Sequence, residues 1–237
     1  IAAHRVDCRL YRKRDFALQA TDLTGMRAMR DPAAASPTPS LTVRGVAVYA
    51  GLLDRAQQEA LLASVRRVVE AAPLFRPVTA RGQEMSVRMT SAGRLGWVSD
   101  RRGYRYEPRH PSGAPWPPIP DEVLAVWRAV AGDPADPDCC LVNFYGEGAR
   151  MGLHQDRDEA DFSHPVVSIS LGDDALFRIG NLERGGKTES LWLRSGDVLV
   201  MGGDARLLHH GIDRVKPGTS TLLKDGGRLN LTLRVAL

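Results

Sequence analysis

The chain has 237 residues, of which 43% are hydrophobic and 25% are charged. This composition is typical of a globular protein with one well-buried core or two small ones, and it excludes collagen, coiled coils and wholesale disorder. The net charge of +4 divides into 7 − 4 = +3 over residues 1–40, 13 − 8 = +5 over 41–131 and 12 − 16 = −4 over 132–237. A basic partner surface is therefore expected in the first half of the chain.

The three cysteines form neither a disulfide framework nor a CxxC zinc spacing, because two of them, Cys139 and Cys140, are adjacent. This pattern favours a reducing compartment. No apolar run approaches the roughly 18 residues that span a bilayer, and the chain does not begin with a signal-peptide pattern. We therefore expect a cytoplasmic protein that does not bind membranes.

Residues 1–40 end in a Pro- and Ala-rich stretch and lack sustained periodicity, so we interpret them as a flexible or non-native N-terminal tail. A strand is predicted from Leu41 to Tyr49. A helix follows, opened by Asp54 as N-cap and ended by Pro73.

A second helix is predicted after Pro120, with Asp121 as its cap and Gly132 at its end. Its buried side is expected to carry Leu124, Trp127 and Ala131.

Beyond residue 132 the hydrophobic period changes to two. Short strands are predicted at 141–145, 166–171, 176–179, 191–193, 198–201, 207–212 and 228–235. Gly-rich turns separate them, as in Gly172-Asp173 and Gly226-Gly227. The pattern favours an antiparallel sandwich or jelly roll, in an α+β chain that is mainly β.

A metal-ligand pattern lies just after the first of these strands. His154 and Asp156 are two residues apart, so in extended chain both side chains project to one side, about 7 Å apart at the backbone. Asp158 lies on the same side but farther away, at about 13 Å from His154. With His209 or His210 as a third ligand, the set would form the two-His-one-carboxylate face of non-haem Fe(II) sites.

The last predicted strand alternates leucines with hydrogen-bonding side chains. Arg228, Asn230, Thr232 and Arg234 share one face of this strand. The ordinary interpretation directs that face to water. The alternative makes it the wall of a cavity in which two Arg side chains hold the ends of a small dicarboxylate, because the guanidinium group donates paired hydrogen bonds to carboxylates.

Six ordered blocks resemble the bacterial type of the AlkB family of Fe(II)- and 2-oxoglutarate-dependent nucleic-acid dealkylating dioxygenases. The resemblance runs from about residue 41 to the end of the chain and leaves residues 1–40 outside it. The blocks are Asn143-Phe144-Tyr145, His154-Gln155-Asp156-Arg157-Asp158-Glu159, Val167 to Gly172, Ser195 to Gly203, Arg206 to Gly211, and Arg228 to Arg234. Two positions depart from the family pattern. Met201 stands where an aromatic residue is frequent, and Phe144 stands where a polar residue is frequent.

The resemblance implies a double-stranded β-helix, or jelly-roll, catalytic core over residues 132–237, and a helical support with a nucleotide-recognition lid over 41–131. It implies that His154, Asp156 and His210 are the catalytic iron ligands, which chooses His210 over His209. It implies Fe(II), 2-oxoglutarate and O2 as cofactor and co-substrates. The residues implied to bind 2-oxoglutarate are Asn143, Phe144, Tyr145, Arg228, Asn230 and Arg234.

A basic segment with interleaved aromatic rings precedes this core. Eight Arg lie between residues 76 and 109, together with Trp97, Tyr104 and Tyr106, a combination that suits phosphate contact and base stacking. The resemblance implies that Trp97 stacks on the target base opposite His154 and that Tyr104 contacts the backbone. Its further substrate residues are Arg105, Tyr106, Asp158 and Arg184.

The expected activity is direct-reversal repair by oxidative demethylation of N1-methyladenine and N3-methylcytosine in single-stranded DNA, with RNA as a second candidate substrate. Formaldehyde, succinate and CO2 would be released by a monomeric enzyme. An Fe(II)/2-oxoglutarate hydroxylase of a protein or small molecule is the alternative, and a non-catalytic nucleic-acid-binding module is a third hypothesis.

Overall fold

The computed structural model describes residues 36–133 and 135–237. The expected tail over residues 1–40 therefore lies almost wholly outside the described residues. The helices are α2 (Arg55–Ala71), α3 (Asp121–Val130) and the short 3-10 turn η1 (Gly203–Ala205). The strands are β1 (Leu41–Val43), β2 (Val46–Tyr49), β3 (Arg88–Gly93), β4 (Gly96–Asp100), β5 (Gly103–Glu107), β6 (Cys139–Tyr145), β7 (Met151–His154), β8 (Val166–Gly172), β9 (Asp174–Ile179), β10 (Glu189–Leu193), β11 (Val198–Met201), β12 (His210–Lys216) and β13 (Arg228–Arg234).

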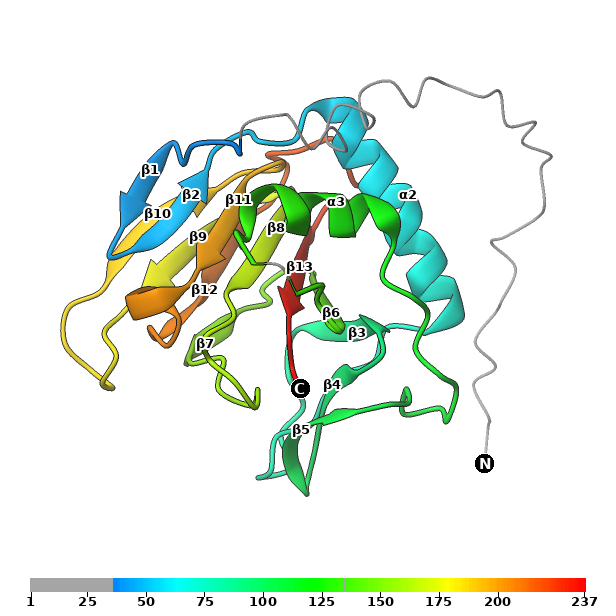
Figure 1. The fold of residues 1–237 in the computed structure, drawn as a ribbon. Helices are drawn as coiled ribbons and strands as arrows, with labels where there is room; N and C mark the ends of the chain where they lie inside the picture. The colour runs from blue at the N-terminus through cyan, green and yellow to red at the C-terminus, as the bar shows by residue number, and fades with distance from the viewer. Residues whose placement is uncertain (1–35, 134) are drawn as a thin grey trace.

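The described strands form two main antiparallel sheets (Figure 1). The major sheet has the order β1-β2-β11-β8-β13-β6-β3, and the minor sheet has the order β10-β9-β12-β7. Strands β4 and β5 form a separate hairpin. The neighbours in each main sheet include strands far apart in sequence, as in a double-stranded β-helix. The predicted mainly-β jelly roll is confirmed.

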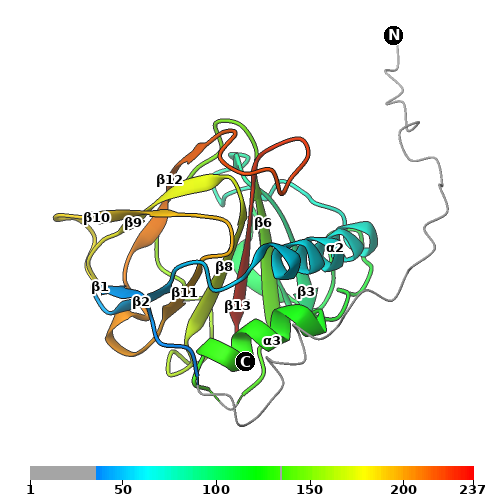
Figure 2. The same ribbon diagram turned by 90° about the horizontal axis from the view of Figure 1, so that it is seen from above.

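The two helices cover the outer face of the major sheet (Figure 2). Leu229, Leu231 and Leu233 of β13 belong to the hydrophobic core that includes buried residues of both helices, such as Leu61 and Trp127. Because side chains alternate along a strand, the intervening residues of β13 face the minor sheet instead. The space between the two sheets is therefore lined partly by polar side chains.

Helix α2 forms as predicted. The Asp54 side chain accepts from the Gln57 amide, and the Gln57 side chain bonds back to the Asp54 amide, which completes a capping box. In α3, however, Asp121 is the first helical residue, and Pro120 occupies the N-cap without a side-chain hydrogen bond. The prediction of Asp121 as cap was wrong.

The buried side of α3 also differs from the prediction. Leu124 and Ala131 are only partly buried, whereas Val123, Val126 and Trp127 are buried. The helix face that packs against the sheet is therefore rotated slightly from the predicted face. The expected strand over 41–49 is a hairpin instead, since Arg44 and Gly45 take positive φ angles of 52° and 84° and reverse the chain.

Two strand boundaries in the core depend on local turns. Strand β12 begins at His210 rather than residue 207, because η1 and the turn after it occupy the preceding residues. Strand β7 was not predicted, and it has only four residues, one of which is Gly152. Neither α2 nor α3 is long and apolar enough to cross a bilayer, and the described chain contains no other candidate.

Candidate active site

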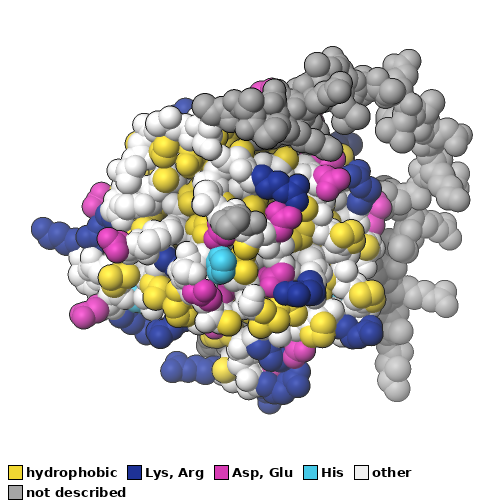
Figure 3. Space-filling view, viewed as in Figure 1, with side chains coloured by type: hydrophobic (Ala, Val, Ile, Leu, Met, Phe, Trp, Pro, Cys, Tyr) yellow, Lys and Arg dark blue, Asp and Glu magenta, His cyan; other side chains and the backbone are white. Residues whose placement is uncertain are grey.

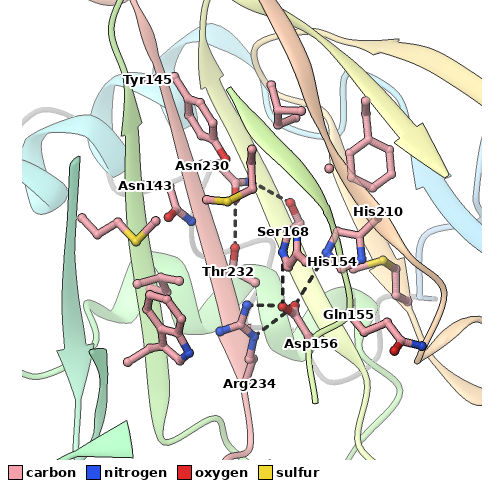
Figure 4. A pocket seen from close by; sticks show the side chains of 18 of the residues that line it. Asn143, Tyr145, His154, Gln155, Asp156, Ser168, His210, Asn230, Thr232 and Arg234 are labelled. Carbon is pink, nitrogen blue, oxygen red and sulfur yellow. Dashed lines mark hydrogen bonds and ion pairs between the residues drawn. The ribbon is translucent and has the colours of Figure 1, made fainter. Parts of the chain in front are cut away.

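A cavity of about 330 Å³ lies between the two sheets. The major sheet contributes side chains of β6, β8, β11 and β13, and the minor sheet contributes those of β7, β9, β10 and β12 (Figure 4). Three kinds of side chain meet there: two histidines with a carboxylate, two buried arginines with hydrogen-bonding partners, and a group of apolar side chains. Its apolar lining includes Met85, Met89, Leu141, Met151, Phe177, Leu193, Met201 and Ile212.

His154, Asp156 and His210 converge at one end of the cavity. One ligand atom from each lies within 4.8 Å of the others. The Nε2 atoms of the two histidines are 3.7 and 3.8 Å from the two Asp156 carboxylate oxygens. Strand register produces this arrangement, because His210 of β12 pairs directly with His154 of β7. The three side chains offer the two-His-one-carboxylate set that suits non-haem Fe(II).

Both imidazole rings are held with Nε2 toward Asp156. Nδ1 of His154 is 2.9 Å from the Gly152 carbonyl, and Nδ1 of His210 is 3.0 Å from the Leu208 carbonyl. A carbonyl only accepts, so each Nδ1 must donate its proton, which leaves the Nε2 lone pair free for a metal. His209 points elsewhere, with its Nδ1 against the Asn181 carbonyl on the outer side of the minor sheet.

The electrostatics of the site keep Asp156 ionised and His210 neutral. Burial alone would raise the pKa of Asp156, but Arg234 and the two histidines outweigh it and hold that pKa well below its usual value. Burial lowers the pKa of His210 to about 4. An anionic carboxylate and neutral imidazoles are the protonation states that bind a metal ion.

Arg228 lies buried at another part of the cavity wall. Its Nη2 donates to Ser170 Oγ at 2.8 Å, but its Nε and Nη1 have no hydrogen-bond partner among the described residues. The Oδ1 atom of Asn143 is also buried and unpaired. Burial lowers the pKa of Arg228 to about 10, so the group is still a cation at neutral pH.

An unpaired buried guanidinium is costly unless a ligand completes its hydrogen bonds. Burial raises the pKa of the nearby Tyr145 to about 12, so its hydroxyl stays protonated and can donate. The donors of Arg228 therefore fit one carboxylate of a dicarboxylate such as 2-oxoglutarate.

The polar face of β13 points into the cavity rather than to water. Asn230 donates to Ser168 Oγ at 2.6 Å and accepts from Thr232 Oγ1 at 2.9 Å (Figure 4). Phe144 lies on the opposite face of β6, where its ring packs with the helix-side core and under Arg88. The expectation that the Phe144 side chain belongs to the 2-oxoglutarate site is therefore corrected, because strand alternation directs it away from the cavity.

Arg234 was expected to bind a carboxylate of 2-oxoglutarate, but its guanidinium group is already paired with carboxylates of the protein. Its Nη2 is 2.8 Å from Asp156 Oδ2, and its Nε is 3.3 Å from Glu159 Oε1. Burial would lower the pKa of Arg234, but Asp156, Tyr106 and Glu159 raise it well above its ordinary value. The two arginines at the ends of β13 are thus unequal, since Arg228 has open donors whereas Arg234 is paired with carboxylates.

The hairpin β4–β5 forms the mouth of the cavity. Trp97 and Tyr104 both line it, and their rings stack with centroids 5.4 Å apart. Trp97 Nε1 donates to Asp158 Oδ2 at 2.8 Å. The mouth thus combines aromatic faces with a carboxylate, and His154 also lines the same cavity.

Three expected substrate residues do not line this cavity. Arg105 pairs with Asp100 and Glu107 within the hairpin. The Tyr106 hydroxyl is turned inward to Glu159. Arg184 lines surface hollows on the outer side of the minor sheet. In each case a local ion pair, a buried hydrogen bond or the position of a loop replaces the expected direct contact.

The site also contains residues that we did not expect from the sequence. Glu159 and Arg206 form a buried ion pair next to Asp156, and Ser168 bonds Asn230. Arg206 is a single basic residue among apolar neighbours in Ala205-Arg-Leu-Leu208. That isolation is a weak signal of a buried, paired charge.

Comparisons with known proteins agree with this geometry. Residues 45–234 match the model of the 2OG-Fe(II) oxygenase superfamily. The chain is 56% identical over 200 residues to the alpha-ketoglutarate-dependent dioxygenase AlkB homolog of Caulobacter vibrioides, which covers 84% of this chain and 90% of that relative. It is 43% identical over 183 residues to AlkB of Escherichia coli, covering 75% and 84% respectively.

The structure is similar to the solved structure of OsALKBH1, with a TM-score of 0.70 and 32% identity, over 82% of this chain and 98% of that one. The extent of these matches shows the family, and the cavity contains side chains that suit both a metal ion and a dicarboxylate. The chain therefore belongs to the AlkB family of the 2OG-Fe(II) oxygenases and is a dioxygenase that depends on Fe(II), 2-oxoglutarate and O2.

Proposed function

We propose that this dioxygenase repairs alkylated nucleic acid by oxidative demethylation of N1-methyladenine and N3-methylcytosine in single-stranded DNA, with RNA as a second substrate. The products are formaldehyde, succinate, CO2 and the restored base. A relative from Mus musculus bears the name nucleic acid dioxygenase ALKBH1 and is 32% identical over 128 residues, which cover 52% of this chain and 33% of that relative. Its name supports nucleic acid as the substrate class.

The observation that carries this proposal is the mouth of the cavity. Asp158 is exposed, hydrogen-bonded to Trp97, and lines the same cavity as His154. N1-methyladenine and N3-methylcytosine are cationic, whereas the unmethylated bases are neutral. A carboxylate beside an aromatic face therefore favours the lesion by charge attraction and by stacking.

The residues divide the work as follows. His154, Asp156 and His210 would hold Fe(II), and Arg228 with Asn143 and Tyr145 would hold 2-oxoglutarate. When bound there, Fe(II) and 2-oxoglutarate would supply the oxidation of the N-methyl carbon.

The protein itself orients the base between Trp97 and His154, so that the methyl group enters the cavity. The apolar lining of methionine and leucine side chains limits water near the reacting carbon.

We further propose that the enzyme acts as a monomer in the cytoplasm. Cys139 and Cys140 are buried free thiols in β6, which suits a reducing compartment.

The test is a mixed pool of methylated DNA and RNA oligonucleotides, incubated with the enzyme, Fe(II), 2-oxoglutarate and air, and analysed by mass spectrometry. We expect the mass of each oligonucleotide that carries a cationic lesion to fall by about 14 Da, because a methyl group is replaced by hydrogen. Formaldehyde should form in the same amount. Asp158→Asn should lower the rate on cationic lesions by about tenfold, since it removes a charge attraction to the base of on the order of 1–4 kcal/mol at about 4 Å. Asp136→Asn, which changes a surface carboxylate paired with Arg128, is the matched control.

Two outcomes would overturn the proposal. Oxidation of a protein or metabolite, with all oligonucleotides unchanged, would favour the alternative hydroxylase. A folded His154→Ala variant with wild-type activity would contradict the iron assignment.

A further inference from the structure

Four buried charged side chains form a cluster that includes Asp156, the carboxylate of the metal-binding triad. They are the carboxylates of Asp156 and Glu159 and the guanidinium groups of Arg206 and Arg234. Two positive and two negative charges balance. None of the four is more than 6% exposed at its side chain, so each depends on the others in place of water.

Glu159 is the bridge of this cluster. Its Oε2 is 3.1 Å from Arg206 Nη2, and its Oε1 is 3.3 Å from Arg234 Nε. Both arginines also hold Asp156: Arg234 contacts the carboxylate at 2.8 Å, and Arg206 Nη1 donates to the backbone carbonyl at 2.7 Å. One carboxylate thus positions both groups that fix the side chain and the backbone of Asp156.

The bridge also reaches the hairpin β4–β5. The Tyr106 hydroxyl donates to Glu159 Oε1 at 2.5 Å and accepts from Arg234 Nη1 at 3.3 Å. In the same hairpin, Tyr106 pairs in register with Trp97. Among the described residues, the chain of contacts therefore runs from the aromatic mouth of the cavity through one hydroxyl to Asp156.

We propose that Glu159 is a positioning residue that couples the placement of hairpin β4–β5, through Tyr106 and Arg234, to the orientation of Asp156 for metal binding. The role of the hairpin at the nucleotide rests on the proposed function. The coupling itself does not, because every contact in it lies within the chain.

Coupling between two sites is reciprocal. If the position of the hairpin affects how Asp156 faces a metal, then metal binding must also order the hairpin. Residues that orient a metal ligand typically change metal affinity by about 10–100-fold when they are replaced. Both consequences can be measured without nucleic acid or turnover.

The first experiment titrates Co(II), as a spectroscopic probe of the site, into Glu159→Gln, Tyr106→Phe and wild-type protein. Gln retains the shape of Glu159 and removes its charge. We expect the affinity for Co(II) to fall about tenfold in Glu159→Gln and a few-fold in Tyr106→Phe, with a shifted Co(II) absorption band in Glu159→Gln. Two matched controls should bind like wild type: Glu122→Gln, whose carboxylate bonds Ser64 on the helix side, and Tyr104→Phe in the same hairpin.

The second experiment follows amide hydrogen exchange of residues 96–107 with and without Co(II). In the wild type and in Tyr104→Phe, we expect Co(II) to slow exchange in the hairpin. In Tyr106→Phe this protection should be lost, while thermal unfolding of the variant shows an intact fold. If Glu159→Gln fails to fold, Tyr106→Phe still tests the coupling, since it removes a single hydroxyl.

Wild-type Co(II) affinity and spectrum in a folded Glu159→Gln would overturn the proposal. So would Co(II)-dependent protection of the hairpin that is unchanged in Tyr106→Phe. The failure of all oligonucleotide substrates would contradict the proposed function instead, and would leave both Co(II) results interpretable.

Discussion

His210 must be neutral to bind a metal, and its surroundings make it so at a cost to the metal-free fold. Burial lowers its pKa to about 4 in the folded chain, whereas an unfolded histidine titrates near 6.5. Below about pH 6.5, His210 binds a proton in the unfolded chain but stays neutral in the folded chain. His210 therefore destabilises the metal-free protein as pH falls from about 6.5 to about 4.

We expect this effect to appear in urea unfolding of metal-free protein at pH 7.5 and pH 5. The wild type should lose about 2 kcal/mol more stability over this range than His210→Asn. Asp156 does not produce the same signal, because its pKa is lowered. The stabilisation that Asp156 contributes to the fold is present above its unfolded pKa near 3.9 and is lost only as pH falls below that value. Equal losses in the wild type and the variant would contradict the depressed pKa of His210.

The choice between neighbouring histidines shows what single residues reveal before a structure is known. The two-residue spacing of His154 and Asp156 was enough to place both side chains on one side. The residues alone could not choose between His209 and His210, because the start of β12 decides which one faces the cavity. That start depends on η1, a turn without a strong sequence signal.

Strand β13 shows the same limit at the scale of an element. Its alternation predicted both the strand and its two faces. The destination of the polar face could not follow from alternation, because it depends on whether a second sheet covers it. The short β7 was missed since it has four residues and no β-branched side chain. The hairpin β4–β5 was missed although it contains strand-favouring aromatic residues, because each of its strands has only five residues and begins at a glycine.

Helix starts were only partly predictable, and the two helices differ in a way that can be measured. Asp54 forms a capping box at the start of α2, whereas Asp121 lies inside α3 and makes no cap. We expect Asp54→Ala to lower the free energy of unfolding by about 1 kcal/mol. Asp121→Ala, the matched control, should change it by a few tenths of a kcal/mol, because Asp121 acts only on the helix dipole. Equal losses in the two variants, measured by urea unfolding, would show that the capping box adds nothing.

At the scale of the whole molecule, residues 41–131 offer fewer free positive charges than their number of Arg side chains suggests, because some of these side chains are in ion pairs. Lys and Arg side chains gather over the lower edge of the molecule, where hairpin β4–β5 lies, with acidic side chains among them (Figure 3). Arg105 is paired with Asp100 and Glu107. Arg102 also pairs with Asp100, whereas exposed Arg101 makes no ion pair with a described residue. Sequence counts cannot distinguish these cases, because the pairs depend on hairpin register.

The unpaired Arg101 should therefore carry more of the salt dependence of single-stranded DNA binding than the paired arginines. Each phosphate that a protein neutralises on a single strand contributes about 0.7 to the slope of log affinity against log salt concentration. We expect Arg101→Gln to reduce that slope by about 0.7, measured by fluorescence anisotropy of a labelled oligonucleotide across a salt series. Arg55→Gln at the start of α2, on the far side of the major sheet, should leave the slope unchanged. A wild-type slope in Arg101→Gln would place the phosphate path away from the tip of the hairpin, and a slope near zero in the wild type would argue against phosphate contact altogether.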